Sequence, residues 1–179
     1  MAKKNSVFRL ILLLVSIVYF YLLVKIILFK FGTPNPPFLM EQLRRAIEDP
    51  ERLKRGLEFG NLIPGDTIRQ NMHHLSYSTD YLNLFGNIAL FVPAGILIRL
   101  GLGRGFLMTL LIGFMISLGL ETSQLVFSIG TFDVDDMILN TSGGVLGYAM
   151  IRAAQALDKN LMPKDPPQEK QASAAPRLL

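Results

Sequence analysis

Four long apolar segments constrain the fold of this chain more than any other feature of its sequence. Each contains about 20 residues, and an α-helix of that length spans the roughly 30 Å of hydrocarbon in a bilayer. Inside a bilayer the chain must satisfy its own backbone hydrogen bonds, so such segments fold as helices. We therefore predict an all-α integral membrane protein whose four transmembrane helices form a bundle, at about residues 8–31, 82–100, 106–127 and 137–157.

The composition agrees with a membrane protein. Hydrophobic residues make up 50% of the 179 residues and charged residues only 18%, whereas a soluble domain carries about 25% charged residues. The formal net charge of +4 is modest and the basic residues are scattered, so we predict no nucleic-acid partner. The chain has no cysteine, which excludes disulfides and thiolate metal sites.

The first apolar segment is longer than the apolar part of a secretory signal peptide, and no small-residue cleavage site follows it. We therefore expect a retained helix. An amphipathic segment follows at residues 38–59, where apolar residues recur at helical spacing on both sides of Pro50 and the charges alternate in sign. This pattern predicts a solvated or interface-lying helical hairpin. Residues 61–66 are typical of a turn.

The distribution of basic residues predicts the orientation in the membrane. Lys3, Lys4 and Arg9 precede the first apolar run, which starts at Leu10, and Arg99 and Arg104 flank the turn between the second and third helices. The loop between the third and fourth helices contains no basic residue, and the segment between the first two helices contains more acidic than basic residues. Because basic residues are enriched on the cytoplasmic side, we predict a multi-pass protein of the cell membrane with both termini in the cytoplasm.

In this topology residues 32–80 and 128–136 lie outside the cytoplasm. The segment 158–179 contains several prolines among Lys, Gln and Ala, and has too few apolar residues to pack. We therefore expect a transmembrane domain at 8–155, followed by a disordered cytoplasmic tail.

Three aspartates, Asp133, Asp135 and Asp136, lie between the last two apolar segments. Carboxylates at a bilayer edge are costly and usually functional. Acidic residues also cap the free N–H groups at the start of a helix, so Asp135 or Asp136 as a cap is an alternative interpretation. In an extended loop Asp133 and Asp135 would point to one side and Asp136 to the other.

Two of these carboxylates together with Glu121 would suit Mg²⁺ or Ca²⁺. They would equally suit a basic side chain, Arg69, Lys25 or Lys30, as a counter-charge. A D-x-D-D string alone does not define a metal site, and we predict neither a metal nor a cofactor.

The third apolar segment carries one polar stripe. Gly113, Ser117, Glu121 and Gln124 follow one another at spacings that place them on one helix face. Glu121 is either a catalytic or ligand-binding carboxylate, as intramembrane carboxylates usually are, or a buried side chain held by Gln124 or a neighbouring helix. The sequence leaves both interpretations open.

Asparagines occupy single faces of two other helices. Asn83 and Asn87 are four residues apart in the second helix, and Asn140 lies one turn before the G-x-x-x-G pair Gly143 and Gly147 in the fourth. Each asparagine alone is more often a hydrogen-bonding contact between helices than a ligand. All these polar groups lie toward the predicted outer helix ends, so we predict one outward-facing polar pocket. Its ligand-binding side chains would be Asn83, Asn87, Glu121, Gln124, Asp133, Asp135, Asp136 and Asn140, with Glu121 and Asp135 as candidate catalytic residues.

Four blocks of this sequence resemble the VanZ-like family in order and spacing. They are Asn61 to Pro64, Leu84 to Gly95, Ser117 to Gln124, and Asp133 to Tyr148. The resemblance covers roughly residues 8–155, although Gly65 stands where an aromatic residue is expected. It implies a bacterial multi-helix membrane protein of the cell envelope, from a family named for low-level resistance to teicoplanin. Teicoplanin is a glycopeptide that binds the D-Ala-D-Ala end of peptidoglycan precursors.

Three functions are compatible with these observations. The first is a non-enzymatic envelope protein that binds a surface lipid or a lipid-linked cell-wall precursor and lowers access of the glycopeptide to its target. The second is a membrane enzyme that modifies such a substrate, with Glu121 as general acid or base and with Asp133 and Asp135 holding a metal or a cationic group. The third is a structural scaffold, in which polar residues fix the helix register and Asp136 with Asn140 caps the fourth helix.

Overall fold

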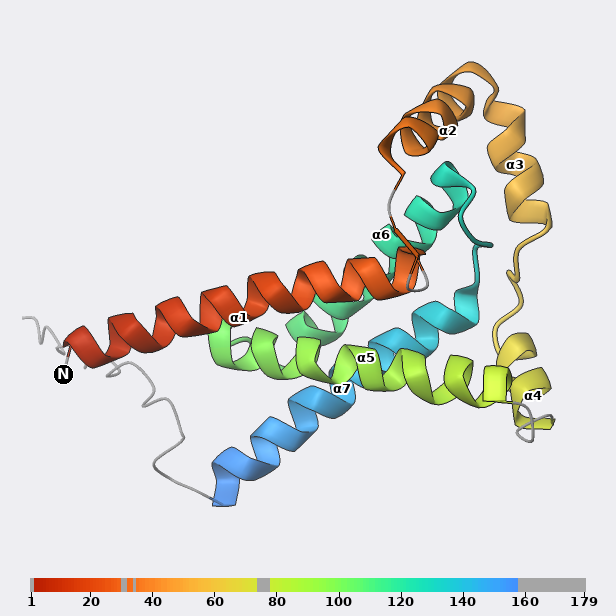
Figure 1. Ribbon diagram of the computed structural model, residues 1–179. Coiled ribbons are helices and arrows are strands. Elements are labelled where there is room, and N and C mark those ends of the chain that lie inside the picture. Colours follow the sequence, from red (N-terminus) through yellow and green to blue (C-terminus); the bar gives the residue numbers. More distant parts are fainter. Residues whose placement is uncertain (1, 30–31, 34, 74–77, 158–179) are drawn as a thin grey trace, which may run out of the picture.

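The computed structural model describes residues 2–29, 32, 33, 35–73 and 78–157, and these residues form seven α-helices and no β-strand. The only β-type pairing in this part is one isolated parallel bridge between Asn61 and Asp133. The helices are α1 (Ala2–Phe29), α2 (Pro36–Glu48), α3 (Pro50–Glu58), α4 (Asp66–His73), α5 (Ser78–Leu102), α6 (Phe106–Phe127) and α7 (Val134–Leu157) (Figure 1).

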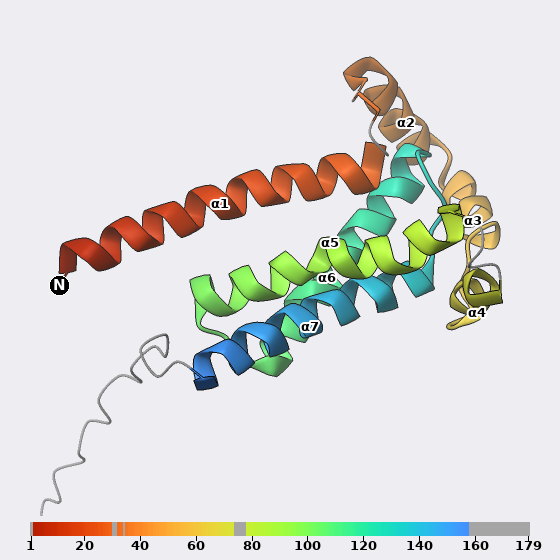
Figure 2. The same cartoon turned by 60° about the horizontal axis from the view of Figure 1, so that its bottom comes forward.

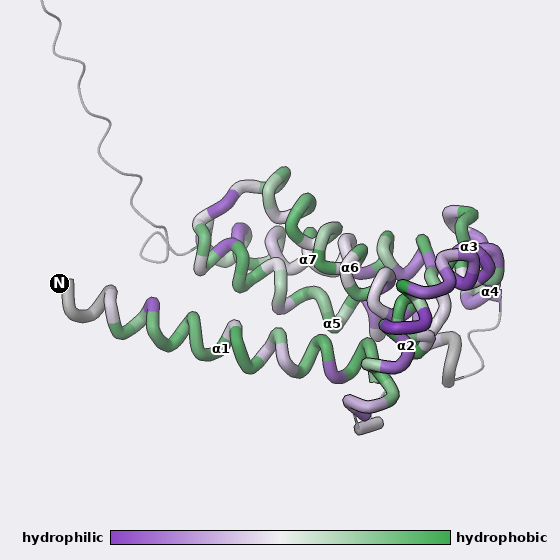
Figure 3. The backbone as a smooth tube through the Cα atoms, turned by 90° about the horizontal axis from the view of Figure 1, so that it is seen from above, coloured by the Kyte–Doolittle hydropathy of each residue, from purple (hydrophilic) through white to green (hydrophobic). Residues whose placement is uncertain are grey.

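The four long helices lie roughly along one axis with alternating chain direction, and the three short ones gather at one end of them. Figures 1 and 2 show α2, α3 and α4 at the end where α1 and α6 finish and where α5 and α7 begin. The N-terminus lies at the opposite end. Hydrophilic residues concentrate in α2, α3 and α4, whereas α1 is hydrophobic over most of its length (Figure 3). The short helices thus form a polar cap on an apolar bundle.

Three described helices are long and apolar enough to cross a membrane: Ser6–Phe29, Tyr81–Leu102 and Phe106–Phe127. The fourth long helix, α7, has 24 residues but is not among them. Its sequence includes two aspartates, an asparagine, an arginine and a glutamine, which lower its hydropathy. The prediction of an all-helical chain is confirmed for the described residues. Three of the four predicted transmembrane helices are long and apolar enough to cross a membrane.

Glycines allow α5 and α7 to approach closely. A Cβ atom added at Gly143 or Gly147 would overlap the carbonyl oxygens of Ile88 or Val92 on α5, and one added at Gly95 would overlap the Gly144 carbonyl oxygen. Only glycine fits where two helix backbones come this near. The contact predicted from the G-x-x-x-G pair is confirmed, and its partner is α5.

The C-terminal half of α1 packs on α5 and α6 through a small core of Leu23, Phe91, Ala94 and Leu120. The Tyr19 hydroxyl donates a hydrogen bond to a backbone oxygen of α5, at 2.8 Å. Over the remainder of α1 most apolar side chains are exposed, which suits a helix largely surrounded by lipid.

Several predicted boundaries need correction. The second long helix begins at Ser78 rather than residue 82, and the fourth begins at Val134 rather than 137. The amphipathic segment 38–59 is confirmed as two helices, α2 and α3, that break at Asp49 before Pro50. Helix α4 was not anticipated, because its apolar residues are too few to show a helical period. The predicted disordered tail, 158–179, lies outside the described residues.

Candidate functional site

Asp135, the second residue of α7, is the centre of a buried polar cluster. Its side chain is fully buried. One carboxylate oxygen accepts a hydrogen bond from the Gly65 backbone N–H at 2.6 Å. The other accepts from the Ile68 N–H at 3.0 Å and the Asn61 side-chain amide at 3.3 Å. Because three donors surround it, the carboxylate is stabilised in a position where an unpaired charge would be very costly.

Asp133 reinforces the same contact from the residue before α7. Its carboxylate accepts hydrogen bonds from the Asn61 amide at 3.0 Å and from the Thr67 hydroxyl at 2.9 Å. The backbones also pair, because Asn61 N–H donates to the Phe132 oxygen and the Asn61 oxygen accepts from Val134 N–H, both at 2.9 Å. We call the side chains of Asn61, Thr67, Asp133 and Asp135 the acidic latch, since they fasten residues 61–68 to the start of α7.

Glu121 supports the acidic latch from α6. Its carboxylate accepts a hydrogen bond from the Asp133 backbone N–H at 2.9 Å, and its side chain is 1% exposed. The predicted stripe on the third helix therefore does bring Glu121 to the aspartate loop. The contact is with the backbone of that loop and orients Asp133.

Asp136 points away from the acidic latch and contacts α5. Its carboxylate accepts a hydrogen bond from the Asn87 side-chain amide at 2.6 Å. Both side chains are partly exposed. Asn83, one turn earlier on α5, is exposed. Asp133 and Asp135 do face one side and Asp136 the other, but the predicted extended loop is wrong, because Asp135 and Asp136 lie in the first turn of α7.

The last two predicted ligand residues lie elsewhere in the bundle. Gln124 is buried and donates to the backbone oxygen of Ile27 at 3.1 Å, which ties α6 to the end of α1. Asn140 is 1% exposed and donates to the Ser117 hydroxyl at 2.9 Å, which ties α7 to α6. The side-chain oxygen of Asn140 has no hydrogen-bond partner among the described residues. Both amides are contacts between helices.

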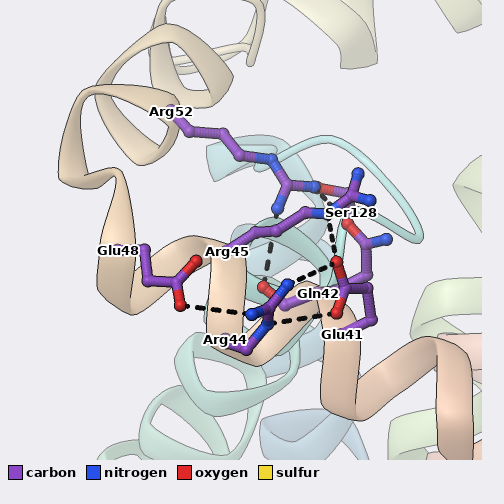
Figure 4. Close-up of polar contacts among 7 residues, drawn as sticks. All are labelled: Glu41, Gln42, Arg44, Arg45, Glu48, Arg52 and Ser128. Carbon is purple, nitrogen blue, oxygen red and sulfur yellow. Dashed lines mark hydrogen bonds and ion pairs between the residues drawn. The ribbon is translucent and has the colours of Figure 1, made fainter.

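The arginine-rich hairpin formed by α2 and α3 lies against the C-terminal end of α6 (Figure 4). Arg52 of α3 donates to the Gln42 side chain on α2 and to the Ser128 hydroxyl after α6. Within α2, Glu41 pairs with Arg44 at 3.2 Å and with Arg45 at 2.8 Å. The hydrogen bonds from Arg44 and then Arg45 hold the pKa of the exposed Glu41 carboxyl below its ordinary 4.5.

Two hollows flank these contacts. A small one of about 150 Å³ lies beside the acidic latch and is lined by residues 63–66 and Arg69. Arg69 pairs there with Asp66 at 3.2 Å. A larger apolar groove of about 630 Å³ lies between α6 and α7. Within the described part of the chain, no group of three or more His, Asp or Glu side chains is arranged to hold a metal ion.

Two interpretations of the aspartates are wrong in detail. The residue that caps α7 is Asp133, whose side chain accepts from the Asp135 N–H at 2.8 Å, rather than Asp135 or Asp136. The reason is that the helix starts three residues earlier than predicted. The carboxylates of the acidic latch are also not balanced by Arg69, which pairs with Asp66 instead. Lys30 lies outside the described residues.

Sequence reasoning missed half of the acidic latch. Asn61 and Thr67, and the backbone N–H groups of Gly65 and Ile68, are its donors. A turn was predicted at 61–66, and turns leave backbone N–H groups without partners. That signal indicates a need for acceptors, but it does not say which acceptors along the chain will meet it.

Comparison with known proteins gives two matches. A family model described as VanZ/LLP1 matches residues 16–155. Protein VanZ of Enterococcus faecium is 32% identical over 81 residues, which make up 45% of this chain and 50% of that protein. The chain therefore spans about half the length of this curated relative. No solved structure matches.

Proposed function

Because the chain belongs to the VanZ/LLP1 family, we propose that this membrane protein acts in the bacterial cell envelope and lowers susceptibility to teicoplanin. It does so by binding a surface lipid or a lipid-linked cell-wall precursor at the polar end of the bundle. While this ligand is bound to the protein, the glycopeptide has less access to the D-Ala-D-Ala end of the precursor. The proposal is supported by the family and by the relative named protein VanZ.

The observation that carries this proposal is the position of the polar groups. The acidic latch, Glu121 and the Asn87–Asp136 pair all lie at one end of three helices that can cross a membrane. Carboxylates at a membrane boundary are costly, so a cluster of them indicates a site rather than chance. This end faces the headgroup region, where a lipid-linked ligand presents its polar part.

The side chains divide into two roles in this proposal. Asp133, Asp135 and Glu121 hold residues 61–68 in place through bonds to protein donors. The partly exposed Asn87 and Asp136, with the exposed Asn83 beside them, contact the ligand. Gln124 and Asn140 contribute by fixing the helices on which these groups stand.

The proposal includes a membrane topology. Helix α7 is the fourth transmembrane helix, since about 36 Å of helix packs along α5 through glycine contacts. Both termini are cytoplasmic and α2 to α4 are outside. The chain has no cysteine, so single cysteines report the topology directly. A membrane-impermeant maleimide should label Thr131→Cys in intact cells and should label Gly105→Cys only after the cells are opened. The reverse pattern would overturn the orientation.

A structural scaffold is the second candidate, and one observation favours it. Both carboxylate oxygens of Asp135 accept protein hydrogen bonds, and the side chain is fully buried. The acidic latch can therefore serve only to hold residues 61–68. An enzyme that used Asp135 on a substrate would first have to open the latch, so catalysis by Asp135 is the least supported of the three functions.

Teicoplanin susceptibility tests the proposed function. The full chain, Asp136→Asn and Glu121→Gln would be expressed in a teicoplanin-susceptible bacterium, with membrane amounts measured through a tag. Glu48→Gln, on the exposed side of α2, is a matched control. We expect the parent and the control to raise the minimal inhibitory concentration equally, and Asp136→Asn to lose this effect at an unchanged membrane amount.

The outcomes separate the candidates. If the parent does not change susceptibility, the proposed function fails. If Asp136→Asn and Glu121→Gln both act like the parent while present in the membrane, the charged site is not needed and the scaffold remains. If Glu121→Gln alone fails and its membrane amount drops, Glu121 acts through folding of the acidic latch.

A further inference from the structure

An apolar groove runs between α6 and α7, from the start of α7 beside the acidic latch toward the other end of the bundle. The α6 wall consists of Phe106, Leu110 and Phe114, and the α7 wall runs from Val134 to Ala149. It has a volume of about 630 Å³ and opens at the surface of the molecule. Because one wall is a helix that can cross a membrane, the groove opens toward lipid hydrocarbon.

Two arginines lie close in sequence to the residues that line one end of this groove, one near each wall. Arg104 precedes Phe106 by two residues, and Arg152 follows Ala149 by three residues on the same face of α7. The ring contact between Phe106 and Tyr148, at 6.2 Å between centroids, shows that these two helix ends are adjacent. Neither arginine forms a hydrogen bond or ion pair with a residue that the structure describes.

Within the described residues, no acidic side chain belongs to α6, to α7 or to the turn before α6 at this end of the groove. No Asp or Glu lies between Asp80 and Glu121, or between Asp136 and Asp158, so the acidic groups of α6 and α7 are all at the opposite end. The N-cap residue of α6, Gly105, supplies no side chain to the first N–H groups of that helix. The positive end of the helix dipole is therefore left open next to Arg104.

We propose that this groove binds an anionic two-chain phospholipid of the phosphatidylglycerol class. One acyl chain lies in the groove and the phosphate lies between Arg104 and Arg152. A hydrocarbon layer of one leaflet is about 15 Å deep, which corresponds to about ten residues of helix. From Arg152 this depth reaches Ser142, within the α7 wall of the groove. The lipid would enter from the leaflet at the C-terminal end of α7.

Fluorescence quenching tests this proposal, because the chain has no tryptophan. A single tryptophan at Leu146, which lines the groove, would report contact with acyl chains. Met150→Trp, at an exposed position of α7 outside the groove, is the matched control. The full-length proteins would be placed in phosphatidylcholine bilayers containing increasing fractions of either phosphatidylglycerol or phosphatidylcholine with brominated acyl chains.

At Leu146→Trp we expect brominated phosphatidylglycerol to bind about tenfold more strongly than brominated phosphatidylcholine. Each arginine near the anionic phosphate favours the charged lipid roughly fivefold at low salt, and screening by salt reduces the combined preference of two arginines to about tenfold. Met150→Trp should show no such preference. The preference should vanish in Arg104→Gln/Arg152→Gln and persist in Arg9→Gln, which removes a basic residue of α1. Phe114→Trp is a second reporter on the α6 wall if Leu146→Trp does not fold.

Two results would overturn the proposal. Equal quenching by the two lipids at both groove reporters would mean that the groove only touches bulk lipid. Weak quenching by both lipids that falls further as the protein-to-lipid ratio rises would mean that a second copy of the chain covers the groove. Neither result depends on teicoplanin susceptibility, so this proposal and the proposed function succeed or fail separately.

Discussion

Asp135→Asn is the sharpest test of the acidic latch, because it keeps the size of the side chain and changes only its hydrogen bonding. In the native chain one oxygen accepts from Gly65 and the other from Ile68 and Asn61. Asparagine keeps one acceptor oxygen. In the best arrangement that oxygen accepts from Ile68 and Asn61. The new NH₂ group then points at the Gly65 N–H, and these two groups, both donors, cannot bond to each other.

The magnitude follows from these contacts. A hydrogen bond to a charged group contributes about 1.5–3 kcal/mol, and a buried donor left without an acceptor costs about 1–3 kcal/mol. The two terms overlap for the Gly65 N–H, and the bonds from Ile68 and Asn61 weaken as the charge disappears. We therefore expect the free energy of opening residues 61–68 to fall by about 3 kcal/mol, whereas the helices of the bundle remain packed.

Amide hydrogen exchange measures this opening directly. A change of about 3 kcal/mol corresponds to a roughly 100-fold faster exchange in peptides covering 61–68. Asp66→Asn is the control, since the same chemical change is made at a partly exposed carboxylate that pairs with Arg69 and Gln70, where we expect less than about 0.5 kcal/mol. If Asp135→Asn leaves exchange at 61–68 unchanged, or if Asp66→Asn accelerates it equally, the reasoning about the latch is refuted.

Three further predictions address packing and charge. Gly147→Ala should destabilise the protein in detergent by about 2–3 kcal/mol, because its Cβ meets the α5 backbone, whereas Gly119→Ala, with open space around it, should change stability little. Tyr19→Phe should cost about 1 kcal/mol in the same unfolding measurement through loss of one hydrogen bond to α5. NMR should show the pKa of the Glu41 carboxyl below 4.5, because Arg44 and Arg45 stabilise the charged form. The pairs with these arginines would then persist at pH 4.5 and be lost only as the pH falls through the lowered pKa. A titration midpoint at or above 4.5 would contradict the pairing.

The helices could largely be predicted from the sequence, because each depends on local signals. The third helix was placed at 106–127, as observed, since a glycine-rich turn and an aspartate loop bound a continuous apolar run. The fourth helix is predicted at 137–157 and is observed as α7 from Val134, but it does not meet the length and hydropathy criteria of a membrane span. Its hydropathy is diluted by polar residues that packing on α5 and α6 satisfies, and packing is not visible in a local window.

The candidate site could be predicted only in part. Its acceptors were found, because carboxylates next to apolar helices are conspicuous. Their donors were not, because Asn61 and Asp133 are separated by 72 residues and no periodicity connects positions so far apart. The grouping of Gln124 and Asn140 with the site rested on their predicted depth in the membrane. Hydrogen bonds to Ile27 and Ser117 instead direct those side chains between helices.

The acidic latch also explains why two distant blocks of sequence occur together. The Asn61–Pro64 block and the block that begins at Asp133 are both among those by which the chain resembles its family, and the structure joins them through paired backbones and shared side chains. A chain with only one block would leave either two carboxylates or a set of backbone N–H groups without partners, at a cost of several kcal/mol. The two blocks are therefore two halves of one structural unit. The chemistry of any bound ligand must be sought in the groups that this unit positions, above all Asn87 and Asp136, rather than in the aspartates that close it.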